Sequence, residues 1–213
     1  MKISIEKFQE LYNISQIEGS DVEKSTLLVQ CLTGKTEEEV SAMPDKKKKN
    51  LVDNINAAFQ EFNSKTEKSK PKSIIRLNGK WYRLNYDLAK PPMNAGKYVE
   101  LATFSNDIIA NMHRIMATMC SPVRLTLNGF KNIDREINHS KLSEEMLQYD
   151  FAAGYQSCVF FYAVFSKSIQ NSPIYFKSIS MNQNQMQVIL TNLQEVMDGF
   201  IMRKWFQNLK ILV

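Results

Sequence analysis

The stretch DFAAGYQSCVFFYAVFSKSI, residues 150–169, is the most apolar part of the chain and constrains its fold more than any other segment. Read as a helix, it has one apolar seam, made of Phe151, Tyr155, Cys158, Tyr162, Phe165 and Ile169. Val159, Phe160 and Val164 lie off this seam, so the helix is apolar on every side and is expected to be buried on every side. This predicts either the central helix of a domain or a helix whose second face is covered by another subunit.

The start of this helix is predicted near Ser143, which can cap the first turn, with Leu142 and Leu147 spaced as a hydrophobic staple. A membrane span is not expected. A spanning helix needs about 20 mostly apolar residues, whereas Asp150 and Lys167 bracket a much shorter apolar segment. Val159, Phe160 and Val164 are therefore candidate protein-interface residues.

The dipeptide Asn78-Gly79 lies between two extended runs and predicts a β-hairpin, because both residue types tolerate the positive φ of a type I′ turn. The register that follows places Ile75 opposite Tyr82 and Arg76 opposite Trp81. A lone hairpin is marginal in water, so this one needs a helix or another chain against it. Trp81 is accordingly another candidate interface residue.

A long helix is predicted over residues 97–120, ended by Ser121-Pro122. Its seam is Tyr98, Leu101, Ser105, Ile108, Met112, Ile115 and Met119. Beyond it, Asn128-Gly129 makes a second hairpin possible with a weaker signal, and the polar residues up to Lys141 are expected to form an exposed loop. A last helix is predicted over residues 182–208, with Trp205 as a further candidate interface residue.

The first 62 residues are predicted to be a small helical domain, in which Gly34 ends one helix and Thr36 and Glu39 form the capping box of the next. The run Lys46, Lys47, Lys48 and Lys49 is either a phosphate or acidic-partner contact or the solvated start of the helix that carries Leu51, Val52, Ile55, Phe59 and Phe62. The second interpretation is favoured.

Residues 63–72 lack large apolar side chains and include Pro71, so they are predicted to be a linker. Residues 73–213 then form a second domain with the hairpin and a core of three helices. The expected fold class is mainly α with a small β-hairpin, an α+β arrangement.

The residues expected of a catalytic or metal site are missing. The two histidines, His113 and His139, are predicted to be structural and in a polar loop respectively, and no HExxH, CxxC, GxSxG or GxGxxG motif occurs. The three cysteines are far apart in apolar patterns, which indicates buried free thiols and a reducing compartment. With Glu6 and Glu10 inside its first turns, the N-terminus is not expected to be an export signal. We expect a protein that is not an enzyme and has no cofactor.

Nucleic-acid binding is an alternative prediction. The chain has 27 basic and 22 acidic residues, a net charge of +5, which is mild for a dedicated nucleic-acid binder. Trp81, Tyr82 and Tyr86 could stack bases beside Arg76 and Arg83. Because a hairpin that packs on a helix shows the same aromatic pattern, nucleic acid is not the favoured main partner.

Four segments in order resemble accessory proteins from the virion and tail-assembly gene clusters of tailed bacteriophages, especially those of gut Bacteroides-type hosts. They are ISIEKFQELYNI, LTGKTEEEVSAM, LNGKWYRLNYDLAKPPMNAGKYVELATFSND and IIANMHRIMATMCSP. The resemblance covers residues 1–123 and contains no diagnostic motif.

The resemblance implies a non-enzymatic structural component of the virion near the portal vertex and tail, arranged as a multi-copy ring and made in the host cytoplasm. The implied partners are other phage structural proteins and further copies of the chain. A tail assembly chaperone that is not retained in the virion is the alternative that the same resemblance implies.

Overall fold

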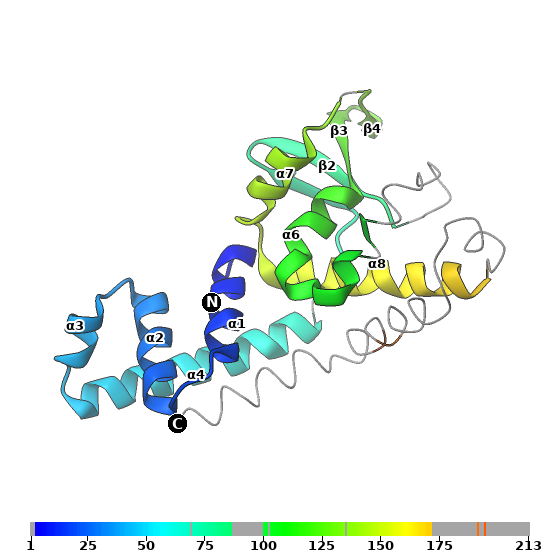
Figure 1. Ribbon diagram of the computed structural model, residues 1–213. Coiled ribbons are helices and arrows are strands. Elements are labelled where there is room, and N and C mark those ends of the chain that lie inside the picture. Colours follow the sequence, from blue (N-terminus) through cyan, green and yellow to red (C-terminus); the bar gives the residue numbers. More distant parts are fainter. Residues whose placement is uncertain are drawn as a thin grey trace.

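The structure, a computed structural model, describes residues 3–68, 70–86, 100, 101, 103–134, 136–171, 191 and 194. The predicted fold class is confirmed, because these residues are mainly α-helical with a small antiparallel sheet (Figure 1). The elements are α1 (Ile5–Gln16), α2 (Asp21–Thr33), α3 (Glu37–Ser41), α4 (Asp45–Lys68), β1 (Ile74–Leu77), β2 (Lys80–Leu84), η1 (Ser105–Asp107), α6 (Ile108–Met119), β3 (Cys120–Thr126), β4 (Gly129–Asn132), α7 (His139–Met146) and α8 (Phe151–Asn171).

The turn chemistry near the N-terminus is as predicted. Gly34 follows α2 with a φ of 68°, the left-handed conformation that ends many helices. The Thr36 side chain accepts a hydrogen bond from the Glu39 amide, and the Glu39 side chain accepts one from the Thr36 amide, which completes the capping box of α3. Local sequence therefore sets the ends of these helices.

The predicted linker is wrong over its first part, because α4 continues to Lys68. Thr66 is buried in this last stretch, and its carbonyl accepts a hydrogen bond of 2.7 Å from the side chain of Gln156 in α8. Residues 63–68 include good helix formers and no breaker before Pro71, so nothing local ends the helix at Phe62. The division into domains of residues 1–62 and 73–213 stays a prediction, and one buried core includes residues from both sides of it.

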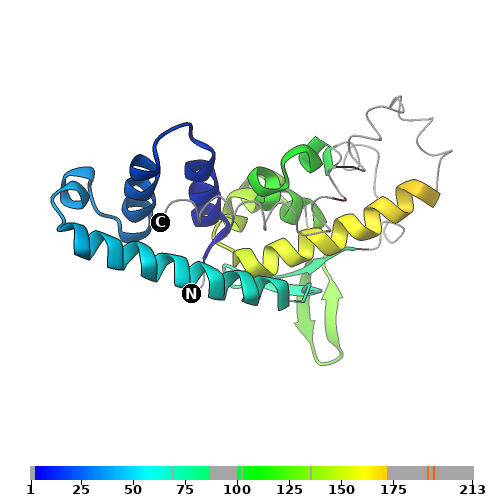
Figure 2. The ribbon, with the colours of Figure 1, turned by 90° about the horizontal axis from the view of Figure 1, so that it is seen from below.

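An aromatic cluster joins α1, α4 and α8. Phe8 stacks on Phe151 with ring centroids 3.5 Å apart, and Phe62 lies 6.2 Å from Phe8 and 5.7 Å from Phe151. All three side chains are at most 1% exposed. The cluster therefore fixes three helices that are far apart in the chain (Figure 2).

The chain from residue 139 to residue 171 forms two helices and not the single one predicted from Ser143. Asn138 caps α7, Ser143 lies buried within it, and Asp150 accepts from the Ala153 amide at the start of α8. The break is stabilised by α1, whose first amides donate to the carbonyls of Leu147 and Tyr149, each at 2.9 Å. Sequence-local signals could not reveal these partners, which lie more than 140 residues away.

The long helix predicted over residues 97–120 is interrupted. Residues 100, 101, 103 and 104 are helical, and the 3-10 turn η1 follows them. Asp107, the last residue of η1, adopts a φ of −146° and caps α6, which ends at Met119. Ser121 and Pro122 do not end the helix; they lie in β3, where Pro122 is opposite Tyr82. The predicted seam is confirmed where described, since Leu101, Ser105, Ile108, Met112, Ile115 and Met119 are all buried. Tyr98 is outside the described residues.

The sheet contains both hairpins, in the order β1-β2-β3-β4 with every neighbouring pair antiparallel. The predicted register of the first hairpin is confirmed: Ile75 pairs with Tyr82 and Arg76 with Trp81, and both Asn78 and Gly79 have positive φ. The second hairpin also forms, with positive φ at Gly129 and not at Asn128, so its turn is not of type I′. Residues 131–141 were expected to form an exposed loop. The first of them belong to β4 and the last of them to α7.

We expect Phe62→Ala to lower the free energy of unfolding by about 3–5 kcal/mol, because it removes a ring from the centre of the aromatic cluster. Phe160→Ala is the matched control, since it removes the same atoms from a side chain that is 42% exposed, and its loss should be clearly smaller. Urea unfolding followed by circular dichroism measures both. Equal losses would contradict the central role of the cluster.

Candidate functional site

One face of the sheet, here called the outer face, is made of Ile74, Arg76, Trp81, Arg83, Ser121, Val123, Leu125, Phe130 and Asn132, as strand alternation and register require. The opposite, inner face carries the buried side chains of Ile75, Leu77, Tyr82 and Leu84, and α6 lies on that side (Figure 1). Of the described helices, α6 is the one with more than marginal contact with the strands, through β2. The outer face carries the exposed side chains of Arg76, Leu125 and Asn132, so this part of the sheet is accessible to a partner.

Trp81 is the centre of the outer face. The guanidinium carbon of Arg76 lies 5.4 Å from the centre of its ring, and the Phe130 ring lies 5.1 Å away at an angle of 57°. Val123, the residue paired with Trp81 across β2 and β3, is only 3% exposed. The two half-buried aromatic rings thus form a platform over the sheet with a cation on one side.

Arg83 connects the middle of the outer face to β4. Its guanidinium donates to Asn132 Oδ1 and to the Phe130 carbonyl, both at 2.9 Å, across the strand that carries Val123. Both acceptors are neutral, so they hold the Arg83 guanidinium group in place without neutralising its positive charge.

The charge of the sheet is of one sign. The charged side chains of its strands are Arg76, Lys80, Arg83, Arg124 and Lys131, and none is acidic. None of them forms an ion pair with a carboxylate of the described residues. Arg76 and Arg83 belong to the outer face, and Lys80, Arg124 and Lys131 belong to the inner face. The sheet therefore carries positive charge on both faces, which favours an anionic partner.

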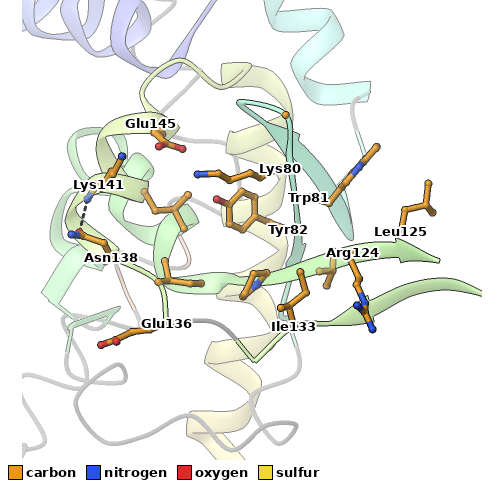
Figure 3. A pocket seen from close by; sticks show the side chains of 15 residues that line it. Lys80, Trp81, Tyr82, Arg124, Leu125, Ile133, Glu136, Asn138, Lys141 and Glu145 are labelled. Atoms are coloured by element: carbon orange, nitrogen blue, oxygen red, sulfur yellow. Dashed lines mark hydrogen bonds between the residues drawn. The ribbon is translucent and has the colours of Figure 1, made fainter.

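A pocket of about 410 Å³ lies between the inner side of the sheet and α7 (Figure 3). Lys80 and Tyr82 from β2 point toward Lys141 and Glu145 from α7, and Pro122, Ile133, Ile137 and Leu142 add apolar walls. Glu145 Oε2 is buried and has no hydrogen-bond partner among the described residues. The lining contains no histidine, cysteine, serine or threonine, and its ionisable side chains are lysines, an arginine, glutamates and a tyrosine.

The β3–β4 hairpin projects from the body of the molecule (Figure 2) and carries exposed apolar residues. Leu127 at its tip is fully exposed, Leu125 is 62% exposed, and Ile133 just beyond β4 is 37% exposed. Sequence reasoning missed these residues and Phe130. The signal that could have found them was the alternation of apolar and polar residues on both sides of Asn128-Gly129, which is typical of a hairpin.

The candidate interface residues do not form one patch. Phe160 in α8 is 42% exposed, so α8 is not a helix buried on every side within its own chain, and cover of this face by another subunit stays a prediction; the Phe160 ring meets Tyr86 edge-on at 4.9 Å. Val159 and Val164 of the same helix are half-buried. Trp81 lies on the outer face of the sheet, where its ring contacts Phe130. A helix packed along one seam leaves its far side open unless a second layer covers it. Trp205 lies outside the described residues.

The lysine run lies in the first turns of α4, in agreement with the favoured interpretation. Lys46, Lys47 and Lys49 are exposed, while Lys48 Nζ donates to Thr26 Oγ1 at 2.8 Å and ties α4 to α2.

Two of the residues predicted to stack bases have other contacts in the structure. Tyr82 is only 6% exposed on the inner face, and Tyr86 donates to the Lys72 carbonyl at 2.6 Å.

The histidines and cysteines have structural partners. The His113 ring is 3.2 Å from Gln9 Nε2, and burial lowers its pKa. His139 begins α7, not a loop as expected, and contacts Thr118 Oγ1 at 2.8 Å. Cys120 and Cys158 are buried free thiols as predicted, and Cys31 is half-buried. Across the described part of the chain, no cluster of three or more His, Cys, Asp or Glu side chains could hold a metal ion.

No helix within the described residues is long and apolar enough to cross a membrane. In comparisons with known proteins, no family model, no curated protein and no solved structure matches this chain.

We expect Glu145→Gln to raise the free energy of unfolding by about 1 kcal/mol, because it removes a carboxylate that has a buried, unpartnered oxygen and lies in the last turn of α7, where negative charge is unfavourable. Glu144→Gln is the control, with the same charge change at an exposed neighbour. Chemical denaturation of both variants gives the difference. A loss of stability in Glu145→Gln would show that this carboxylate has a partner that stabilises it.

Proposed function

We propose that this chain is a non-enzymatic interaction component of a tailed-bacteriophage virion, placed in the portal and tail region as part of a multi-copy ring. The observation that carries the interaction role is the projecting β3–β4 hairpin, with Leu127 fully exposed and Leu125 62% exposed. Covering apolar side chains at the tip of a hairpin with another protein is favourable, because it removes their surface from water. The resemblance of residues 1–123 to phage accessory proteins supports the virion role.

A ring requires that each copy offer two different surfaces. Here the hairpin tip is one surface, and the pocket beside α7 is a recess for it on the next copy, with Ile133, Ile137 and Leu142 as apolar parts of walls that also carry charged side chains. A contact in which the tip of one copy enters the pocket of the next is head-to-tail, and such contacts close into rings when the rotation allows. The two features together favour the multi-copy arrangement over a lone monomer.

Leu127→Asp tests the interaction surface, because it places a charge where the apolar tip would be buried. We expect the wild-type chain to self-associate in analytical ultracentrifugation and Leu127→Asp to shift it toward the monomer. Val22→Asp is the matched control, since Val22 is 68% exposed on α2, and it should leave the distribution unchanged. A wild-type chain that stays monomeric at all concentrations would contradict the ring.

Mass spectrometry of purified particles from the phage that encodes the chain tests the virion role. We expect the chain in mature particles, at several copies relative to the portal protein. Its presence in infected cells but absence from particles would favour the tail assembly chaperone instead.

A further inference from the structure

We infer that the outer face of the sheet binds single-stranded nucleic acid, with bases stacked on Trp81 and Phe130 and phosphates held by Arg76 and Arg83. This function is additional to the proposed function and does not rest on it. It uses Trp81, Phe130, Arg76 and Arg83 of the outer face, whereas the proposed ring contact uses the hairpin tip and the pocket; the two surfaces adjoin at Leu125, which lies both on the outer face and in the hairpin.

The arrangement of side chains supports the stacking role. Arg76, Trp81, Val123 and Asn132 form one row across the four strands, and Phe130 lies in the neighbouring row on β4. With Val123 buried, the half-buried indole and Phe130 ring are the aromatic groups at the centre of the face, and the Arg76 guanidinium lies over one part of the indole. Aromatic rings on an open antiparallel sheet are the platforms on which single-stranded nucleic acids stack their bases, largely without regard to sequence.

The charges support the phosphate role. Arg76 is exposed at one edge of the platform, and the Arg83 fork is held by neutral acceptors in the middle. Neither forms an ion pair with a described carboxylate, so binding a phosphate would not require breaking one. Arginine suits this role because its planar group contacts phosphate oxygens in pairs and also stacks on rings.

The combination favours nucleic acid over an acidic protein surface. An acidic protein would satisfy the arginines, but its carboxylates would leave the Trp81 and Phe130 rings without a flat partner. A single-stranded nucleic acid offers a π-face and a phosphate at every nucleotide and so matches both parts of the surface.

The binding test uses the full chain with Trp205→Phe, so that Trp81 is the remaining tryptophan. An oligo(dT) of about 16 nucleotides, the upper end of common site sizes, is titrated while tryptophan emission and fluorescence anisotropy are recorded. We expect saturable quenching of Trp81 that coincides with the anisotropy rise. Binding without a change in Trp81 emission, or no binding at low salt, would overturn the inference.

Variants locate the site. Trp81→Leu should weaken binding by about 5-fold to 150-fold, the range for loss of one stacked base. Arg76→Gln, an exposed change that keeps the fold even if Trp81→Leu does not, should weaken binding and reduce the slope of log K against log salt by about 0.7. Lys46→Gln is the matched control, with the same charge change on α4, and should do neither.

Equal losses in Arg76→Gln and Lys46→Gln would show attraction by net charge alone and overturn the inference. A competition with poly-glutamate distinguishes the other class of partner. Displacement of the oligonucleotide by poly-glutamate at matched charge concentration, with Trp81→Leu binding both equally well, would identify an acidic protein surface as the occupant and also overturn it.

Discussion

The antiparallel pairing of β2 with β3 is the interaction on which the rest of the structure depends. It joins a hairpin at residues 74–84 to one at residues 120–132, with Trp81 opposite Val123 and Leu84 opposite Cys120. Each hairpin alone would be marginal, and together they form a sheet of useful width. The same pairing brings Trp81 within 5.1 Å of Phe130 and lets Arg83 reach Asn132. Both the open face and the recess beside α7 therefore exist because these two strands pair.

Helix α6 packs against this sheet, and α8 packs against α6. α6 leads directly from its last turn into β3, and the Asn85 amide donates to the Met119 carbonyl at 2.9 Å where helix and strand meet. Behind α6, α8 buries Cys158, Phe161, Tyr162 and Phe165, and the Tyr162 hydroxyl donates to the Leu101 carbonyl at 2.9 Å. Gly154 lets α1 approach closely, since a Cβ there would lie 3.2 Å from Ile5 Cδ1. The outer face, on the opposite side of the sheet, carries the exposed side chains of Arg76, Leu125 and Asn132.

The side chains of the outer face and of the β3–β4 hairpin suit the binding of a partner. The outer face carries the cations Arg76 and Arg83, the neutral polar residues Ser121 and Asn132 and the rings of Trp81 and Phe130, and the hairpin carries exposed leucines. The histidines of the described residues contact side chains of neighbouring helices. Cations and rings recognise large anionic or aromatic partners, and exposed leucines recognise apolar protein surfaces. The hairpin tip and the outer face of the sheet therefore suit different kinds of partner.

The sequence by itself determined the local features. Asn78-Gly79 set the turn and register of the first hairpin, Thr36 and Glu39 set a helix start, and the helical seam through Ile108, Met112 and Ile115 identified buried positions, because turn, cap and periodicity depend on residues a few places apart. Only the tertiary structure decided three other features. Ser121 and Pro122 lie in a strand, the helical segment is interrupted near Tyr149, and the Trp81 ring contacts the Phe130 ring. Each of these depends on a partner far away in the chain, β2 for β3 and α1 for the break before α8. A local pattern contains no information about which distant segment supplies the missing hydrogen bonds, and so the interface residues named from the sequence were found on separate surfaces.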